Sequence, residues 1–368
     1  MRLPSTLQAA GAAFLVSFPG IILAQQSIRP ATAVKRLDGS ATTPAAITQI
    51  VQRQMAAAHI TGLAVAVIDR DNIAFLKGFG TRDDANHTAL ADTTPMSAGT
   101  LVQPMVATLV MELVSHKSID LDAPIERYIG TSLDGPFAAV AQDARYHRIT
   151  TRMLLDRMSG IKRGSTPSDS TLHIATDPGT EFSMDDAGFD LLAHVVEHTA
   201  KAPLDRVIHE RLLAPLGMTQ TRVVRNAAVR TAISAVTTPR DMARFIQGVL
   251  GGRGVHLDIP HRVEMLKPQA GRRVARMKDS AGKATGEQLR FSYGLGWGVF
   301  MSPYGPAFFG MAEREGESYY VVAFDDPKAA VILMSDTTNA RRVFPTLLNG
   351  LMRDVFSPAV IEEIGKSR

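Results

Sequence analysis

Cysteine is absent from the 368-residue chain. Disulfides, thiolate nucleophiles and cysteine-ligated metal sites are therefore excluded. Charged residues make up only 21% of the chain, and the formal net charge is +4. No run of Lys and Arg is long enough to indicate a nucleic-acid-binding surface, and the basic cluster at Arg272, Arg273, Arg276 and Lys278 is interpreted as a solvated loop. The apolar content of 45% is ordinary for a globular protein with one large domain or two smaller ones.

The motifs of several cofactor-dependent enzyme classes are also missing. The chain contains no His-Glu-x-x-His, no Walker loop and no dinucleotide-binding fingerprint. His194 and His198 stand four residues apart on a predicted helix, but a single pair is a weak indication of a metal site, and we interpret both as helix-surface histidines. We therefore expect neither a cofactor nor a metal.

The N-terminal residues have the pattern of a secretory signal peptide. A single basic residue, Arg2, precedes an apolar stretch that runs from Ala9 to Ala24. This pattern predicts cleavage near Ala24, hence a signal peptide over 1–24 and a periplasmic or secreted location. A retained membrane anchor is the alternative, although Pro19-Gly20 and the short apolar span argue against it, and no later segment could span a bilayer. Residues 25–44 are expected to be a flexible lead.

Apolar periodicity divides the main domain, residues 45–358, into strands at both ends and helices between them. Apolar runs at 62–69 and 73–77 flank a turn and predict a hairpin. Neither set of strands is large enough to be stable alone, so both ends should pair into one sheet around a helical region at about 81–285. Helices are predicted at 47–58, 104–117, 151–158, 185–199, 204–213, 240–251 and 341–356, and further strands at 291–301, 307–311, 318–324 and 329–335.

Several short segments of the chain form a recognisable set, because they occur together in a fixed order and at fixed spacing. They include Leu113–Tyr128 with Ile-Asp-Leu-Asp-Ala-Pro, Ile149–Ile161 with Leu-Leu-Asp-Arg-Met-Ser-Gly, Pro178–Phe182, Leu213–Met218 and Tyr293–Trp297. Together they resemble the class C β-lactamase and penicillin-binding-protein family of serine hydrolases, over roughly residues 45–355. The resemblance implies an α/β fold of the α+β type, in which an antiparallel sheet is flanked by helices and an all-helical region is inserted.

The family's Ser-x-x-Lys motif falls on Thr100-Leu-Val-Gln103, counted back from the segment Ile119–Asp122. The mechanism needs a hydroxyl at a helix N-terminus and an amine one turn later that takes its proton. Thr100 keeps a hydroxyl, although β-branching stiffens its rotamer. Gln103 cannot accept a proton at neutral pH. Thr100 could therefore serve only as the N-cap of the following helix.

The family's Tyr-x-Asn motif falls on Met184-Asp185-Asp186. Met184 cannot act as an acid or a base, and Asp186 keeps the shape of Asn without its amide donors. Both aspartates could instead be no more than capping and first-turn charges of a helix.

The family's third motif, His-x-Gly or Lys-Thr-Gly, falls on Met311-Ala312-Glu313. The imidazole or cation that would hold a substrate carboxylate is missing. Glu313 replaces a glycine and should obstruct the groove and repel an anionic substrate, unless Arg314 offsets its charge. Met184 and Met311 are expected to add apolar packing where the family has polar groups.

Two other segments, Ser159–Lys162 and Ser280–Lys283, also spell Ser-x-x-Lys. Neither opens an obvious buried helix, so we interpret both as chance matches.

With all three motifs replaced, we expect an exported family member that is non-catalytic and acts in binding or regulation, with a cell-wall peptide or another small ligand as its partner. The alternative is an active esterase, D-alanyl peptidase or β-lactamase that uses Thr100 as nucleophile with an unrecognised base. A third possibility is a carboxylate-lined binding site built from Asp186 and Glu313.

Overall fold

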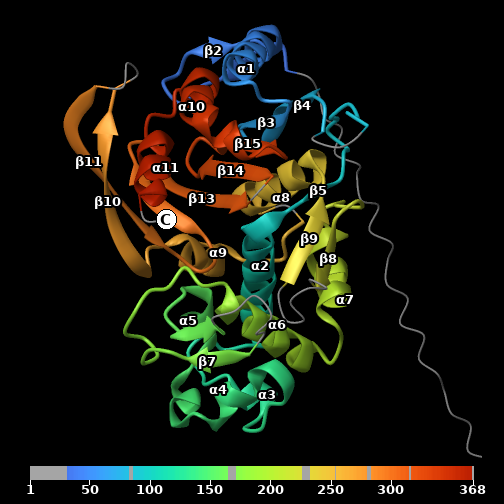
Figure 1. Cartoon of the computed structure of the whole chain (residues 1–368), viewed down its shortest axis with the longest axis vertical. Coiled ribbons are helices and arrows are strands. Elements are labelled where there is room, and N and C mark those ends of the chain that lie inside the picture. Colours follow the sequence, from blue (N-terminus) through green and yellow to red (C-terminus); the bar gives the residue numbers. More distant parts are fainter. Residues whose placement is uncertain are drawn as a thin grey trace, which may run out of the picture.

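The computed structural model describes residues 31–82, 86–164, 171–225, 233–252, 254–279, 283–314 and 316–366. At its centre lies an antiparallel sheet with the strand order β10-β11-β12-β13-β14-β15-β3-β4 (Figure 1). Ala66 of the N-terminal hairpin pairs with Ile332 near the C-terminus, so both ends of the chain build one sheet, as predicted. The strands are β3 Gly62–Asp69, β4 Asn72–Gly80, β10 Ala270–Lys278, β11 Ala284–Tyr293, β12 Gly298–Ser302, β13 Gly305–Arg314, β14 Glu317–Phe324 and β15 Ala329–Ser335.

Helices cover both faces of this sheet (Figure 1). Along β3, Ala64 and Ala66 face one apolar core, and Leu63 and Val65 face the other, which explains why the strand is apolar throughout. The predicted α/β fold is therefore confirmed. One face is covered by α1 Pro44–Ala58, α10 Phe344–Met352 and α11 Ser357–Gly365, and the other by helices that include α2 Val102–Ser115 and α8 Pro239–Gly251.

The region between β4 and β10 is mainly helical and also holds two small sheets. Its helical elements are η1 Gly99–Leu101, α3 Glu126–Ile129, η2 Gly135–Phe137, α4 Ala138–Gln142, η3 Ala144–Arg148, α5 Thr151–Leu155, α6 Ala187–Ala200, α7 Leu204–Ile208, η4 His209–Leu213 and α9 Ile259–Leu266. The small sheets are formed by β5 Met96–Ser97, β9 Ile233–Thr237 and β8 Arg222–Arg225, and by β6 Ile161–Arg163 with β7 Leu172–Ile174.

The basic cluster at 272–278 is not a loop, so this prediction was wrong. It lies in β10, which forms a long hairpin with β11 at one edge of the sheet (Figure 1). Ala275 and Met277 are buried, whereas Arg276 and Lys278 between and beyond them are exposed. This two-residue period is the mark of a strand with one buried face. β10 also falls inside the span that was expected to be helical.

The N-terminal region differs in part from the expected flexible lead. β1 Val34–Lys35 pairs with β2 Ala41–Thr42, and the side chain of Val34 is fully buried. The predicted signal peptide, residues 1–24, lies outside the described residues. Within the described ranges, no helix is long and apolar enough to cross a membrane.

The helix predicted at 341–356 is shorter than expected: its first residues belong to the 3-10 turn η5 Thr338–Val343, α10 ends at Met352, and a separate helix, α11, begins at Ser357. The chain leaves α10 at Arg353, whose φ of 60° is left-handed. Asp354 then accepts hydrogen bonds from the amides of Phe356 and Ser357, at 2.9 and 3.0 Å, and so caps the start of α11.

Candidate ligand-binding site

A cavity of about 340 Å³ lies where β13, η1, the loop before α6 and the β11–β12 turn meet. The structure brings together here the replaced positions of all three motifs, which come from distant parts of the chain. The motif positions that line the cavity are Thr100, Gln103, Met184, Asp186, Met311 and Glu313. Its remaining lining includes four aromatic side chains, Phe182, Phe291, Tyr293 and Phe309.

Thr100 is not the N-cap of α2, because it lies inside the 3-10 turn η1 that precedes that helix. Its Oγ1 donates a hydrogen bond to the carbonyl of Met311 on β13, at 3.0 Å. The backbones approach closely at this point: a Cβ on Gly99 would lie 2.9 Å from the Cβ of Ala312, and the φ of Gly99 is +51°. The hydroxyl therefore joins the first motif to the third.

Gln103 is buried, and its Oε1 accepts a hydrogen bond from the guanidinium of Arg157. The same guanidinium donates to the carbonyl of Asp185 at 3.1 Å and to Oδ1 of Asp186 at 3.3 Å. Only 4% of the Arg157 side chain is exposed. A buried cation thus connects the first motif to the second.

Aromatic rings enclose this guanidinium. Its central carbon lies 5.3 Å from the ring centre of Phe189 and 5.0 Å from that of Tyr293. Such contacts partly offset the cost of removing the charge from water. The sequence analysis missed Arg157. The signal was present, since Arg157 stands where the family stretch Leu-Leu-x-His-x-Ser-Gly has its histidine.

The two methionines behave differently from one another. Met184 is 56% exposed, so the expectation that it adds buried apolar packing was wrong. Met311 is half-buried and packs against the apolar core on the α10 and α11 side of the sheet. Met311 therefore fills space at the third motif. Met184, at the second motif, lines the cavity but remains largely exposed to solvent.

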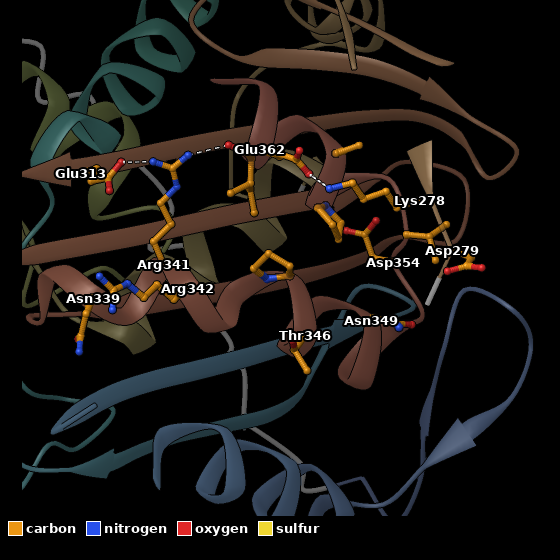
Figure 2. A pocket seen from close by; sticks show the side chains of 15 residues that line it. Lys278, Asp279, Glu313, Asn339, Arg341, Arg342, Thr346, Asn349, Asp354 and Glu362 are labelled. Atoms are coloured by element: carbon orange, nitrogen blue, oxygen red, sulfur yellow. Dashed lines mark hydrogen bonds and ion pairs between the residues drawn. The ribbon is translucent and has the colours of Figure 1, made fainter. Parts of the chain in front are cut away.

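Glu313 also lines the cavity, and its carboxylate is engaged by a residue far along the chain. Oε2 of Glu313 accepts a hydrogen bond from Arg341 of η5 at 2.8 Å, and Arg341 also donates to the carbonyl of Ile361 in α11 at 2.7 Å (Figure 2). The side chain of Arg314, which was considered as the counter-charge, lies outside the described residues. Arg341 thus ties the third motif to α11, whose Ile364 lines the same cavity.

The family model described as "Beta-lactamase" matches residues 47–348. The chain belongs to the β-lactamase family. Among curated proteins, "Putative beta-lactamase-like 1" of Homo sapiens is 26% identical over 51% of this chain and 41% of its own length. "Protein flp" of Staphylococcus aureus (strain MRSA252) is 22% identical over 49% of this chain and 38% of its own. The chain thus spans about two fifths of the length of these relatives.

Solved structures of other proteins share the fold of this chain at low sequence identity. The D-amino acid amidase from Ochrobactrum anthropi SV3 complexed with L-phenylalanine amide has a TM-score of 0.64 at 16% identity, with 83% of this chain and 98% of that chain covered. The octameric penicillin-binding protein homologue from Pyrococcus abyssi has a TM-score of 0.62 at 16% identity, with coverages of 80% and 73%.

In this β-lactamase family member, Ser159, His194 and His198 are not among the residues that line the cavity. Ser159 is buried, and its Oγ accepts a hydrogen bond from the amide of Ile161 at 3.4 Å. Ser280 lies outside the described residues. The rings of His194 and His198 stack edge to face 4.1 Å apart, and the described part of the chain holds no group of three side chains that could bind a metal.

Proposed function

We propose that this β-lactamase family protein acts outside the cytoplasm and binds a small, peptide-like ligand in the cavity without hydrolysing it. The observation that carries the proposal is the position of Arg157 between Gln103 and Asp186. In the family that the chain resembles, this region supplies the amine that takes the proton of the nucleophile. In this chain it is filled by a guanidinium, which cannot accept a proton.

Among the described residues, no side chain accepts a hydrogen bond from the Thr100 hydroxyl. The group that accepts its hydrogen bond is the Met311 carbonyl, which orients the proton but cannot remove it. Burial alone would lower the pKa of Arg157, but the neighbouring Tyr293 and Asp186 raise it, so the guanidinium stays charged. A positioned general base accelerates a reaction about 10²–10⁴-fold. When catalytic groups act as a unit, one remaining group does not compensate for the loss of the others.

The cavity favours a ligand with an apolar or aromatic body. A volume of about 340 Å³ suits a small molecule or a short peptide end, and four aromatic side chains line it. The fold likeness to the D-amino acid amidase, whose complex contains L-phenylalanine amide, supports an amino-acid-derived or peptide ligand, such as the end of a cell-wall peptide.

The test combines acylation and binding on the same purified protein. Incubation with a fluorescent penicillin, nitrocefin and p-nitrophenyl acetate should give neither turnover above background nor a mass increase of the intact protein. Calorimetry with L-phenylalanine amide and with an acetylated D-alanyl-D-alanine peptide should show saturable binding that Phe291→Ala weakens. A covalent adduct that disappears in Thr100→Ala would instead support an active hydrolase.

The location is tested separately. The pattern of residues 1–24 supports export and cleavage near Ala24. Mass spectrometry of the protein isolated from expressing cells should find a mature N-terminus just after this residue. A protein that keeps its first residues and sediments with membranes would support the retained anchor.

A further inference from the structure

A second cavity, of about 480 Å³, adjoins the first, and the two share Phe182 and Gly271 as lining residues. Gly271 of β10 has a φ of +62°, and a Cβ placed on it would lie only 2.9 Å from carbons of the Phe182 ring. The same ring is tilted against that of Tyr293, with 5.8 Å between the ring centres. The Phe182 ring is therefore a common wall, and a ligand in the first cavity can continue across it into the second.

Asp156 lines this second cavity and is only 7% exposed. It lies at the C-terminal end of α5, where its Oδ1 accepts a hydrogen bond from the Met158 amide at 3.1 Å. Only backbone amides donate to this carboxylate among the described residues. A carboxylate that is nine-tenths buried is costly to keep ionised, and the attraction of nearby Arg152 only partly offsets this cost because no described side chain donates a hydrogen bond to Asp156.

The neighbouring charges are already matched with one another. Asp122 accepts two hydrogen bonds from Arg152, at 2.6 and 2.9 Å. Arg152 also donates to Glu264 at 2.5 Å, and Glu264 accepts from Lys267 at 2.6 Å. Two acids and two bases therefore offset one another. Asp156 adds a third negative charge beside these four groups, and Arg152, which already pairs with Asp122 and Glu264, acts on it only at longer range.

We propose that the second cavity is a cation subsite of the same binding site, and that Asp156 binds a primary ammonium group of the ligand. The ligand class is a peptide whose side chain ends in an ammonium group, such as lysine or another diamino acid. Its apolar stem would cross the Phe182 ring, a contact that suits both the methylenes and the cation. The ammonium group would supply a hydrogen-bonded charge partner, which Asp156 lacks among the described side chains. This inference rests on the proposed function, because it extends the ligand placed in the first cavity.

The experiment compares two peptides that differ only in one charge. Nα-acetyl-L-lysyl-D-alanyl-D-alanine and its Nε-acetylated counterpart are titrated into the protein by calorimetry at pH 7.5. We expect the peptide with the free ammonium group to bind at least about tenfold tighter, in keeping with a buried charge-assisted hydrogen bond. Asp156→Asn should abolish this difference. Asp177→Asn, at a half-exposed carboxylate outside both cavities, is the matched control and should preserve it.

A second measurement on the wild-type protein does not depend on the variant folding. Burial raises the pKa of Asp156 to about 6, so its carboxylate is mostly protonated at pH 5, where the lysine ammonium group is still charged. The charged groups around it, Arg152, Asp122 and Glu264, keep their charge at this pH because their mutual pairing lowers the pKa of both acids. The preference for the free ammonium group should therefore shrink about tenfold at pH 5.

The outcomes separate the two proposals. Equal binding of both peptides to the wild-type protein, or a preference that survives Asp156→Asn, would overturn the cation subsite and leave the proposed function standing. If L-phenylalanine amide and both peptides all fail to bind, the proposed function fails, and the subsite fails with it.

Discussion

At the scale of single residues, Arg157 is the side chain on which the candidate site depends. It holds Gln103 and Asp186 together from a position that the sequence analysis did not connect with either motif. The residues of the three motifs could be placed from the sequence because each is a fixed number of positions from a recognisable segment. Arg157 also stands at a recognisable position, but the sequence does not show that its long side chain reaches both Gln103 and Asp186.

We predict that Arg157→Met lowers the free energy of unfolding by about 2–4 kcal/mol, because it leaves the buried amide of Gln103 without its partner and removes the counter-charge of Asp186. Urea unfolding followed by circular dichroism measures the change. The control is Arg206→Met, which breaks an exposed pair with Glu210 and should cost less than about 0.5 kcal/mol. Similar losses for both variants would contradict the structural role of Arg157.

A second residue-scale prediction concerns Asp156 and pH. Its pKa in the folded protein is about 6, raised from 3.8 by burial, so folding favours the protonated form. The carboxylate therefore lowers the free energy of unfolding as pH rises from about 4 to about 6, and this penalty persists above that range. Asp156→Asn should be close to neutral at pH 4 and stabilising by up to about 3 kcal/mol at pH 7. A difference that is the same at both pH values would contradict the assignment.

At the scale of elements, long apolar segments could be predicted from sequence and interrupted or basic ones could not. β3 is apolar from Leu63 to Ile68, and α2 has apolar residues at helical spacing along most of its length; the structure confirms both elements. β10 was not predicted because it contains three arginines, and because buried and exposed side chains alternate clearly only in its second half. The break between α10 and α11 depends on the left-handed residue Arg353, a conformation that its side chain does not indicate.

Arg341 is expected to hold α11 in place, since it bonds to Glu313 of β13 and to the Ile361 carbonyl of α11. We predict that Arg341→Met increases amide hydrogen exchange in residues 357–365 by at least about tenfold while β3 is unchanged, because local opening costs less without the tether. Arg342→Met, at the exposed neighbour in η5, is the matched control. An equal response to both variants would show that the tether does not hold the helix.

At the scale of the whole molecule, the chain has the family fold, while the positions that we assign to its three motifs carry other side chains. The substitutions Thr100→Ser and Gln103→Lys alone should not give covalent labelling by a fluorescent penicillin. The amine introduced at position 103 would become an ammonium group beside the buried charge of Arg157 when it accepts a proton, so it would be a weak base. Adding Arg157→His, the family's residue, should increase labelling. Equal labelling with and without Arg157→His would show that the guanidinium does not block the chemistry.

The pairing of β3 with β15 has a consequence for how the chain folds. β3 cannot acquire this neighbour until the chain has been made as far as β15, since Ala66 pairs with Ile332. A contact between such distant positions closes a very long loop, and loops of this kind slow folding. Until then the edge of the N-terminal hairpin remains open to other strands, which is a hazard for aggregation. Refolding from urea should therefore be slow and depend on protein concentration, and the early chain should need protection while the rest is synthesised.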